Sequence, residues 1–179
     1  MKNENMNRIQ NVSGKFRILF TVLLALVPAS TLLFWIFFNH LPEDLKTGLP
    51  VVANQALPLS TLALAFLTSL IPLSVVIYGL VTLKELFELY ENEIIFSEKN
   101  VSCFRRLGFI SIYWVIANMV FVTLISIVIT FNNLPGEQVI IAQFGVSDIA
   151  MLIIGSIVVL ISWVMNEASK LEDEQAHTV

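Results

Sequence analysis

A charged stretch near the middle of the chain, residues 83–108, holds the side chains best suited to binding a partner. Phe87 and Tyr90 are three positions apart, so a helix would place both rings on one face, and Phe96 follows soon after. The conspicuously patterned residues lie here and not inside the long apolar runs. We therefore expect Phe87, Tyr90 and Phe96 to contact a protein partner.

Two adjacent arginines, Arg105 and Arg106, stand at the edge of the next apolar run. Guanidinium groups in such a place can bind the phosphates of anionic lipid headgroups. Anchoring of the helix in the interface explains the pair more simply, because every spanning helix needs such anchors. We expect anchoring and keep lipid contact as the alternative.

The sequence holds no arrangement of residues typical of catalysis. It lacks a glycine-rich phosphate loop, a Ser/His/Asp set and a His-Glu-x-x-His motif. His40 and His177 are isolated from each other and from any Cys or His, so we expect no zinc site. The basic residues are too few for nucleic-acid binding. We expect no enzyme activity, no cofactor, no metal and no nucleic-acid partner.

The elements that carry these residues are dictated by composition. Of 179 residues 56% are hydrophobic and 13% are charged, with a mean hydropathy of +0.81. Soluble domains have about a quarter of their residues charged, so a soluble enzyme is excluded. A spanning helix needs roughly 20 apolar residues. Four runs satisfy this requirement, and they do not alternate as barrel strands would; they cover residues 16–38, 59–83, 107–131 and 146–165.

We therefore predict an all-α fold, an integral membrane four-helix bundle formed by residues 1–179 as one domain. Span two should continue through Tyr90, and Ser97 should cap the next helix, with Glu98 favoured at its positive end. A helix from Ser97 to Phe131 would be about 50 Å long. Because the hydrocarbon core is only roughly 30 Å thick, residues 83–107 should form a helical hairpin outside it.

The distribution of Lys and Arg predicts the orientation. Nine of the ten lie in the two tails and the middle loop, and Lys46 alone lies in an outer loop. The positive-inside rule then places both termini and the hairpin in the cytoplasm. The first apolar run continues to Phe38, which is longer than the roughly 7–15 residues of a signal peptide core. We expect this helix to remain uncleaved.

Several features of the apolar runs leave alternatives open. The outer segments 49–57 and 139–146 are apolar and could be re-entrant, but we expect them to cap the helix ends. Pro28 and Pro72 interrupt spans one and two, as in some transporters. No ionisable residue is expected in the middle of a span, which argues against transport.

Three other residues near the spans invite a structural interpretation. Asn118 is expected to hydrogen-bond between helices or between subunits. Gly155, followed by Ser156, could allow close helix packing. Cys103 could be palmitoylated, although a reduced thiol facing the cytoplasm is the simpler expectation.

Short motifs in the charged stretch resemble a known family: Phe87-x-x-Tyr90, Ile95-Phe96-Ser97-x-x-Asn100-Val101 and Arg105-Arg106-Leu107-Gly108. They are similar to the bacterial membrane family catalogued as domain of unknown function 2975, as is the acidic C-terminal run that ends in Thr178-Val179. The resemblance implies a four-span protein of the bacterial inner membrane with cytoplasmic ends. One departure is Asn92-Glu93, where a glycine-containing turn is expected. The resemblance implies no catalytic residue, and the frequent encoding of members beside small helix-turn-helix regulators implies a regulatory or stress role.

The functional hypothesis from the sequence is a non-enzymatic accessory or regulatory protein of the inner membrane, acting through its hairpin and acidic tail. The alternative is a small transporter or channel subunit. Its expected partners are the lipid bilayer and a cytoplasmic or membrane protein, and a homo-oligomer is compatible with the sequence.

Overall fold

The computed structural model describes residues 2–51, 53, 55–94, 97–131, 133 and 138–176, and side chains only between residues 8 and 167. Four long helices form the molecule, with two short 3-10 turns after the first. They are α1 (Lys2–Phe37), η1 (Phe38–His40), η2 (Glu43–Leu45), α2 (Leu59–Glu91), α3 (Glu98–Thr130) and α4 (Val146–Ala176). Each long helix contains a segment apolar and long enough to cross a membrane. The predicted all-α, four-span fold is confirmed for the described residues.

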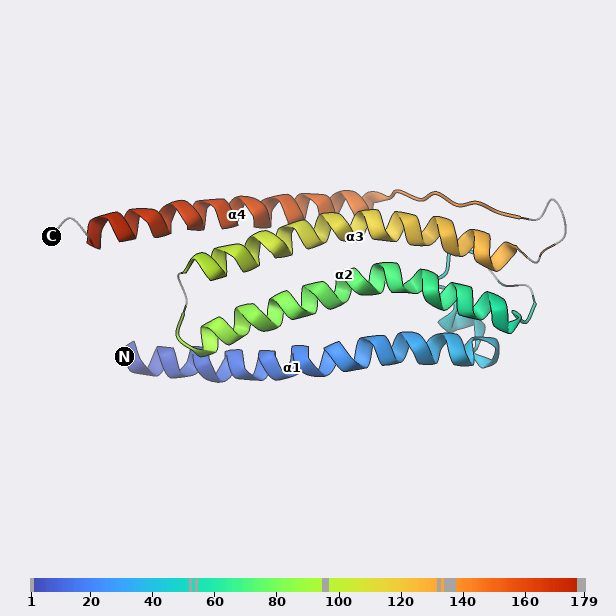
Figure 1. Cartoon of the computed structure of the whole chain (residues 1–179), viewed down its shortest axis with the longest axis horizontal. Coiled ribbons are helices and arrows are strands. Elements are labelled where there is room, and N and C mark those ends of the chain that lie inside the picture. The colour runs from blue at the N-terminus through green and yellow to red at the C-terminus, as the bar shows by residue number, and fades with distance from the viewer. Residues whose placement is uncertain are drawn as a thin grey trace.

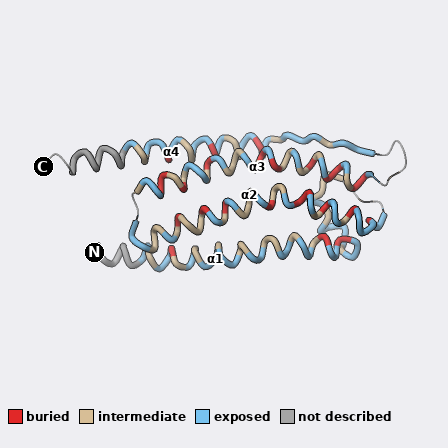
Figure 2. Tube along the Cα trace, in the orientation of Figure 1, coloured by how far each residue is buried: buried red, intermediate tan, exposed pale blue. Residues whose placement is uncertain are grey.

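The four helices lie side by side in chain order (Figure 1). The extensive contacts are those of α1 with α2, α2 with α3, and α3 with α4. The start of α1 and the end of α4 lie at the same end of the molecule, as an even number of spans requires. Buried positions are most frequent on α2 and α3, which have a helix on either side (Figure 2). The outer helices α1 and α4 expose large apolar side chains such as Ile18 and Ile153, which lipid tails would cover.

The main hydrophobic cluster lies at the end opposite to the termini, around Trp35 and Phe38. The indole Nε1 of Trp35 donates a hydrogen bond of 2.9 Å to Ser69 Oγ. Asn39 binds Leu57 at two points, because its amide donates to the Leu57 carbonyl and accepts from the Leu57 N–H, each at 2.9 Å. Parts of the first outer loop, including Leu49, pack against the cluster. For its described residues, this loop caps the helix ends as expected.

The second outer segment behaves differently, and the expectation that it forms a cap is wrong for residues 138–145. These residues are extended and run back along α3 (Figure 1). The Thr130 hydroxyl accepts the Val139 N–H at 3.1 Å, and the Ser126 hydroxyl accepts the Ile141 N–H at 3.0 Å. Backbone away from water must find hydrogen-bond partners within the protein. Ser126 and Thr130, one helical turn apart, provide two of them.

An extended segment therefore precedes α4, whose residues Val146–Glu167 are long and apolar enough to cross a membrane as a continuous helix. Gly155 of α4 packs against Gly108 and Ser111 of α3. Val146 precedes Gly155 by nine residues and the two helices are antiparallel, so α4 begins at about the level of residues 117–120 of α3. The remaining length of α3, about 15 Å, lies beside the extended segment instead.

This offset places one ionisable residue, Asp148, beside the middle of α3. Asp148, in the first turn of α4, is only 8% exposed. By the same count it lies near the level of Ala117, close to the middle of the predicted span 107–131. Its carboxylate accepts the Gly145 N–H at 2.8 Å and so caps the helix.

The crossing of α3 and α4 confirms the packing role predicted for Gly155. A Cβ atom built there would lie 2.7 Å from the Gly108 carbonyl oxygen. A Cβ atom at Gly108 would in turn lie 2.8 Å from the Gly155 carbonyl oxygen. Ser156 is exposed, and its hydroxyl donates to the Leu152 carbonyl of its own helix. Gly108 is the partner that sequence reasoning did not identify.

Candidate functional site

The turn between α2 and α3 ends α2 with two backbone hydrogen bonds. The Ile94 N–H donates to the Leu89 carbonyl at 2.9 Å, and the Glu93 N–H donates to the Tyr90 carbonyl at 3.2 Å. This is the Schellman pattern, whose next-to-last position is usually glycine because its φ is positive. Glu93 occupies that position with φ 63°. The glycine expected in this turn is therefore absent, yet the left-handed geometry is present.

We predict that Glu93→Gly stabilises the protein. A side chain in the left-handed region costs roughly 1 kcal/mol, which glycine avoids. The substitution also removes an exposed hydrogen bond of 2.9 Å between Gln10 and Glu93, which is worth less. Thermal unfolding in detergent should show a midpoint about 2–4 °C higher than that of the parent. The control is Glu93→Ala, which loses the hydrogen bond but keeps the backbone strain. Its unfolding midpoint should not exceed that of the parent.

The start of α3 is organised by Asn100, which is fully buried. Ser97 caps the helix as predicted, because its hydroxyl oxygen accepts the Asn100 N–H. The Ser97 hydroxyl itself donates to the Asn100 side-chain oxygen, and the Asn100 amide donates to the Ile94 carbonyl at 3.1 Å. The same side chain hydrogen-bonds with the Tyr90 hydroxyl. Asn100 thus ties the end of α2 to the beginning of α3.

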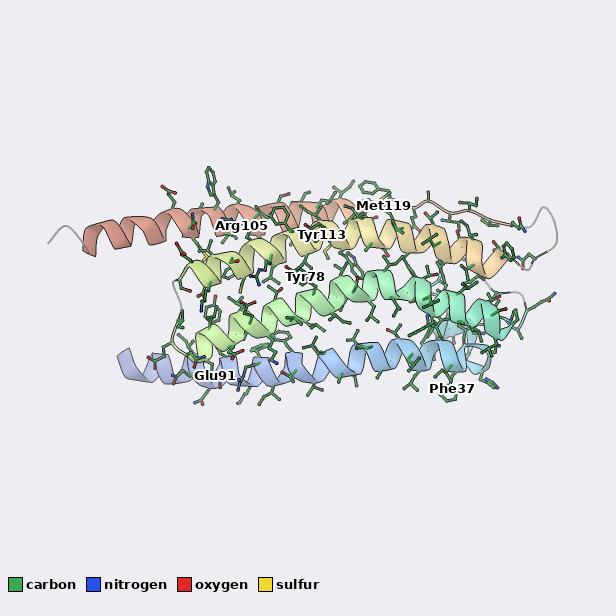
Figure 3. The ribbon with its side chains drawn as sticks, in the orientation of Figure 1. Phe37, Tyr78, Glu91, Arg105, Tyr113 and Met119 are labelled. Atoms are coloured by element: carbon green, nitrogen blue, oxygen red, sulfur yellow. The ribbon has the colours of Figure 1, made fainter. Side chains whose placement is uncertain are left out.

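Phe87 is engaged within the chain. Its ring centroid lies 5.0 Å from that of Phe16 and 5.4 Å from that of Phe20, both on α1. Next to these rings, Arg17 Nε lies 2.8 Å from a carboxylate oxygen of Glu91. Glu91 is labelled at the end of α2 in Figure 3. The aromatic pair expected to meet a partner is therefore used to hold α1 and α3 against α2. Sequence reasoning missed the α1 contact, although Phe16 and Phe20 are one helical turn apart.

The other residues singled out from the sequence differ in their contacts and exposure. Arg106 forms an ion pair with Glu85 at 2.9 Å, and both side chains are almost half exposed. Arg105 is exposed, and within the described part of the chain no acidic side chain lies at ion-pair distance from it. Phe96 lies outside the described residues. Cys103 is fully buried, so it does not face the cytoplasm and offers no thiol for palmitoylation.

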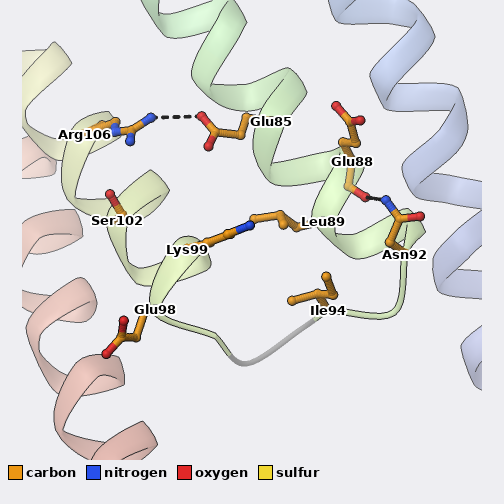
Figure 4. Close-up of a pocket in the computed structure, with 9 residues that line it drawn as sticks. All are labelled: Glu85, Glu88, Leu89, Asn92, Ile94, Glu98, Lys99, Ser102 and Arg106. Carbon is orange, nitrogen blue, oxygen red and sulfur yellow. Dashed lines mark hydrogen bonds and ion pairs between the residues drawn. The ribbon is translucent and has the colours of Figure 1, made fainter.

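A polar hollow of about 610 Å³ opens between the end of α2 and the start of α3. Figure 4 shows the Glu85–Arg106 ion pair at one side of it and Lys99 reaching from α3 toward α2. Glu88 and Glu98 line it from opposite helices. The full lining is Glu85, Glu88, Leu89, Asn92, Ile94, Glu98, Lys99, Ser102 and Arg106.

The lining of the hollow carries more acidic than basic side chains. With Glu85 and Arg106 paired, the lining keeps two carboxylates, Glu88 and Glu98, against the single ammonium of Lys99. Neither carboxylate has a cation at ion-pair distance among the described side chains. No group of three or more His, Cys, Asp or Glu suited to a metal occurs among those side chains either.

Comparison with known proteins identifies the family of the chain. No curated protein and no solved structure matches the chain. One family model does match, over residues 40–179, and its description is a protein of unknown function (DUF2975). The match covers α2, α3, α4 and the hollow between the first two. The chain is therefore a member of the DUF2975 family, as its motifs indicated.

Proposed function

We propose that this protein is a non-enzymatic accessory or regulatory protein of the bacterial inner membrane, which binds a basic segment of a cytoplasmic protein at the hollow. The observation that carries the proposal is the unpaired acidic lining, Glu88 and Glu98, in a hollow open to solvent. Glu88 and Glu98, one on each helix beside the hollow, would attract a Lys or Arg side chain that approached it. Opposite charges arranged in this way steer association and fix its register.

The rigid mounting of the hollow supports a role in recognition. Asn100 joins its two helices, and Phe87 anchors the end of α2 to α1. A preformed site of this kind loses little conformational entropy when it binds. In place of the aromatic contact surface that the sequence suggested, the proposal relies on charged side chains of the same stretch.

Site-specific photocrosslinking in intact membranes tests the proposal. A photoreactive side chain at Ser102, which lines the hollow, should form an adduct with one protein partner, and the same group at Tyr113, on the apolar surface, should not. The double charge reversal Glu88→Lys with Glu98→Lys should abolish the adduct. Asp44→Lys, an exposed reversal at the opposite end, should leave it intact. An adduct that survives the double reversal contradicts the proposal.

A second candidate function, a small transporter or channel subunit, is supported by the buried carboxylate of Asp148 beside the middle of α3. Ionisable residues within membrane helices often mark transport pathways. Half-buried Asn118, at about the same level, makes no side-chain hydrogen bond among the described residues. Asp148→Asn keeps an acceptor for the Gly145 N–H but removes the charge. If the protein transports an ion, this variant should fold normally and lose flux in proteoliposomes; absence of flux from the parent protein rejects the candidate.

A further inference from the structure

A second, smaller groove lies between α1 and α2, separate from the hollow. Its volume is about 230 Å³, and it is lined by Arg17, Ile18, Thr21, Val22 and Lys84. Two cationic side chains from different helices therefore face one space together with aliphatic side chains. This combination is unlike the acidic lining between α2 and α3.

The groove lies at the edge of the apolar spans. Arg17 is the second residue of the predicted span 16–38, and Lys84 directly follows the predicted span 59–83. Because the rings of Phe20 and Phe87 are in contact and the helices are antiparallel, Arg17 and Lys84 lie about 9 Å apart along the helix axis. The groove thus extends across the boundary between the headgroup layer and the apolar spans, whichever side of the bilayer this end faces.

The charges of the groove suit one phosphate ester. Arg17 directs Nε and one terminal nitrogen toward Glu91, at 2.8 and 3.4 Å. A guanidinium has five N–H donors, so others remain for a ligand. Lys84 has no acidic side chain at ion-pair distance within the described chain. Two cations beside one carboxylate leave one net positive charge, which matches the single negative charge of a phosphodiester.

The apolar part of the groove suits an acyl chain. Ile18 and Val22 are 62% and 53% exposed, and they stand one helical turn apart. They lead from Arg17 toward the middle of α1, along the direction that a lipid tail takes. The Thr21 hydroxyl donates to the Arg17 carbonyl of its own helix at 2.9 Å, so the polar contacts to a ligand come from the two cations.

We propose that this groove binds an anionic glycerophospholipid. Its phosphodiester lies between Arg17 and Lys84, and one acyl chain follows Ile18 and Val22. Basic pockets between membrane helices are known to hold anionic headgroups in this way. A soluble phosphate would satisfy the charges but leave the aliphatic side of the groove unused. The proposal is independent of any protein partner at the hollow.

Native mass spectrometry of the full-length protein in detergent tests this site. Phosphatidylglycerol and phosphatidylcholine with identical acyl chains are the probes, and the parent should bind phosphatidylglycerol preferentially. Lys84→Gln should weaken phosphatidylglycerol binding about fivefold, the equivalent of roughly 1 kcal/mol for one cation at a membrane surface. Lys84→Arg should retain it. Lys15→Gln removes an exposed cation at the same end and should bind as the parent does.

The following results would contradict the proposal. Equal binding of the two lipids by the parent, or unchanged binding by Lys84→Gln, shows that the groove does not select a lipid anion. An equal loss in Lys15→Gln shows attraction by overall charge. Displacement of the lipid by an equal concentration of glycerol 3-phosphate shows that the ligand is a soluble phosphate. Matched thermal unfolding of Lys84→Gln and the parent separates lost binding from lost folding.

Discussion

Gly155→Ala and Gly108→Ala are each expected to separate α3 from α4. A methyl group at Gly155 would lie 2.7 Å from the Gly108 carbonyl oxygen and 2.9 Å from the Ser111 Cβ. A methyl group at Gly108 would lie 2.9 Å from the Val159 backbone nitrogen. Backbone atoms cannot rotate away as a flexible side chain can, so the helices themselves must move. Overpacking of this kind costs about 1–3 kcal/mol and occasionally more.

The effect should be large because, within the described part of the chain, the extensive contacts of α4 are those with α3. Thermal unfolding in detergent should give a lower midpoint for both variants, and a protease should cleave the chain near residues 138–145 more readily. Two other glycines provide matched controls. Gly48→Ala meets no atom within 4 Å, and Gly79→Ala meets only the Ile110 side chain at 3.5 Å, so both should behave as the parent does. Similar midpoints for all four variants would contradict the close crossing.

Asn100→Ala is expected to loosen the junction of α2 and α3. The substitution leaves the Ser97 hydroxyl, the Ile94 carbonyl and the Tyr90 hydroxyl without this partner. A buried polar group that loses its partner costs about 1–3 kcal/mol. The free energy of unfolding should fall by at least that amount. The hollow between the two helices should lose its shape as well, so crosslinking from Ser102 should decrease.

Asn92→Ala is the matched control for this prediction. Asn92 is exposed, and its side chain donates only to the Glu88 carbonyl of its own helix, at 2.9 Å. Surface changes of this type usually alter stability by less than about 0.5 kcal/mol. If Asn100→Ala unfolds at the same denaturant concentration as Asn92→Ala, then Asn100 does not organise the junction.

Local features of the chain were predictable from the sequence. The apolar runs specify four spans because about 20 residues are needed to cross the hydrocarbon core. Ser97 specifies the start of α3, since a serine before Glu98 can accept an early N–H of the helix. Gly155 indicates a close helix contact because a small residue permits it. Each of these predictions depends on a short window of sequence.

Features that depend on distant parts of the chain were not predictable. Phe16 and Phe20 lie in an apolar run, where a ring facing Phe87 and a ring facing lipid look alike in sequence. The extended course of residues 138–145 depends on hydroxyl groups of α3, because Ser126 and Thr130 accept their backbone N–H groups. The burial of Asp148 also depends on the packing of α4 against α3. The acidic hollow likewise requires the tertiary pairing of α2 with α3.

The late start of α4 sets the position of the acidic tail. Gly108 of α3 lies opposite residues 155–159 of α4, so Glu98, ten residues earlier, lies near the level of Glu167. The helix continues to Ala176, nine residues or about 13 Å farther (Figure 1). The backbone that carries Glu172, Asp173 and Glu174 is thus held at a fixed distance beyond the hollow, measured along the axis of α4. A protein that contacted both the hollow and the acidic tail would have to span that distance. The helix α4 would therefore act as a spacer that selects partners by size.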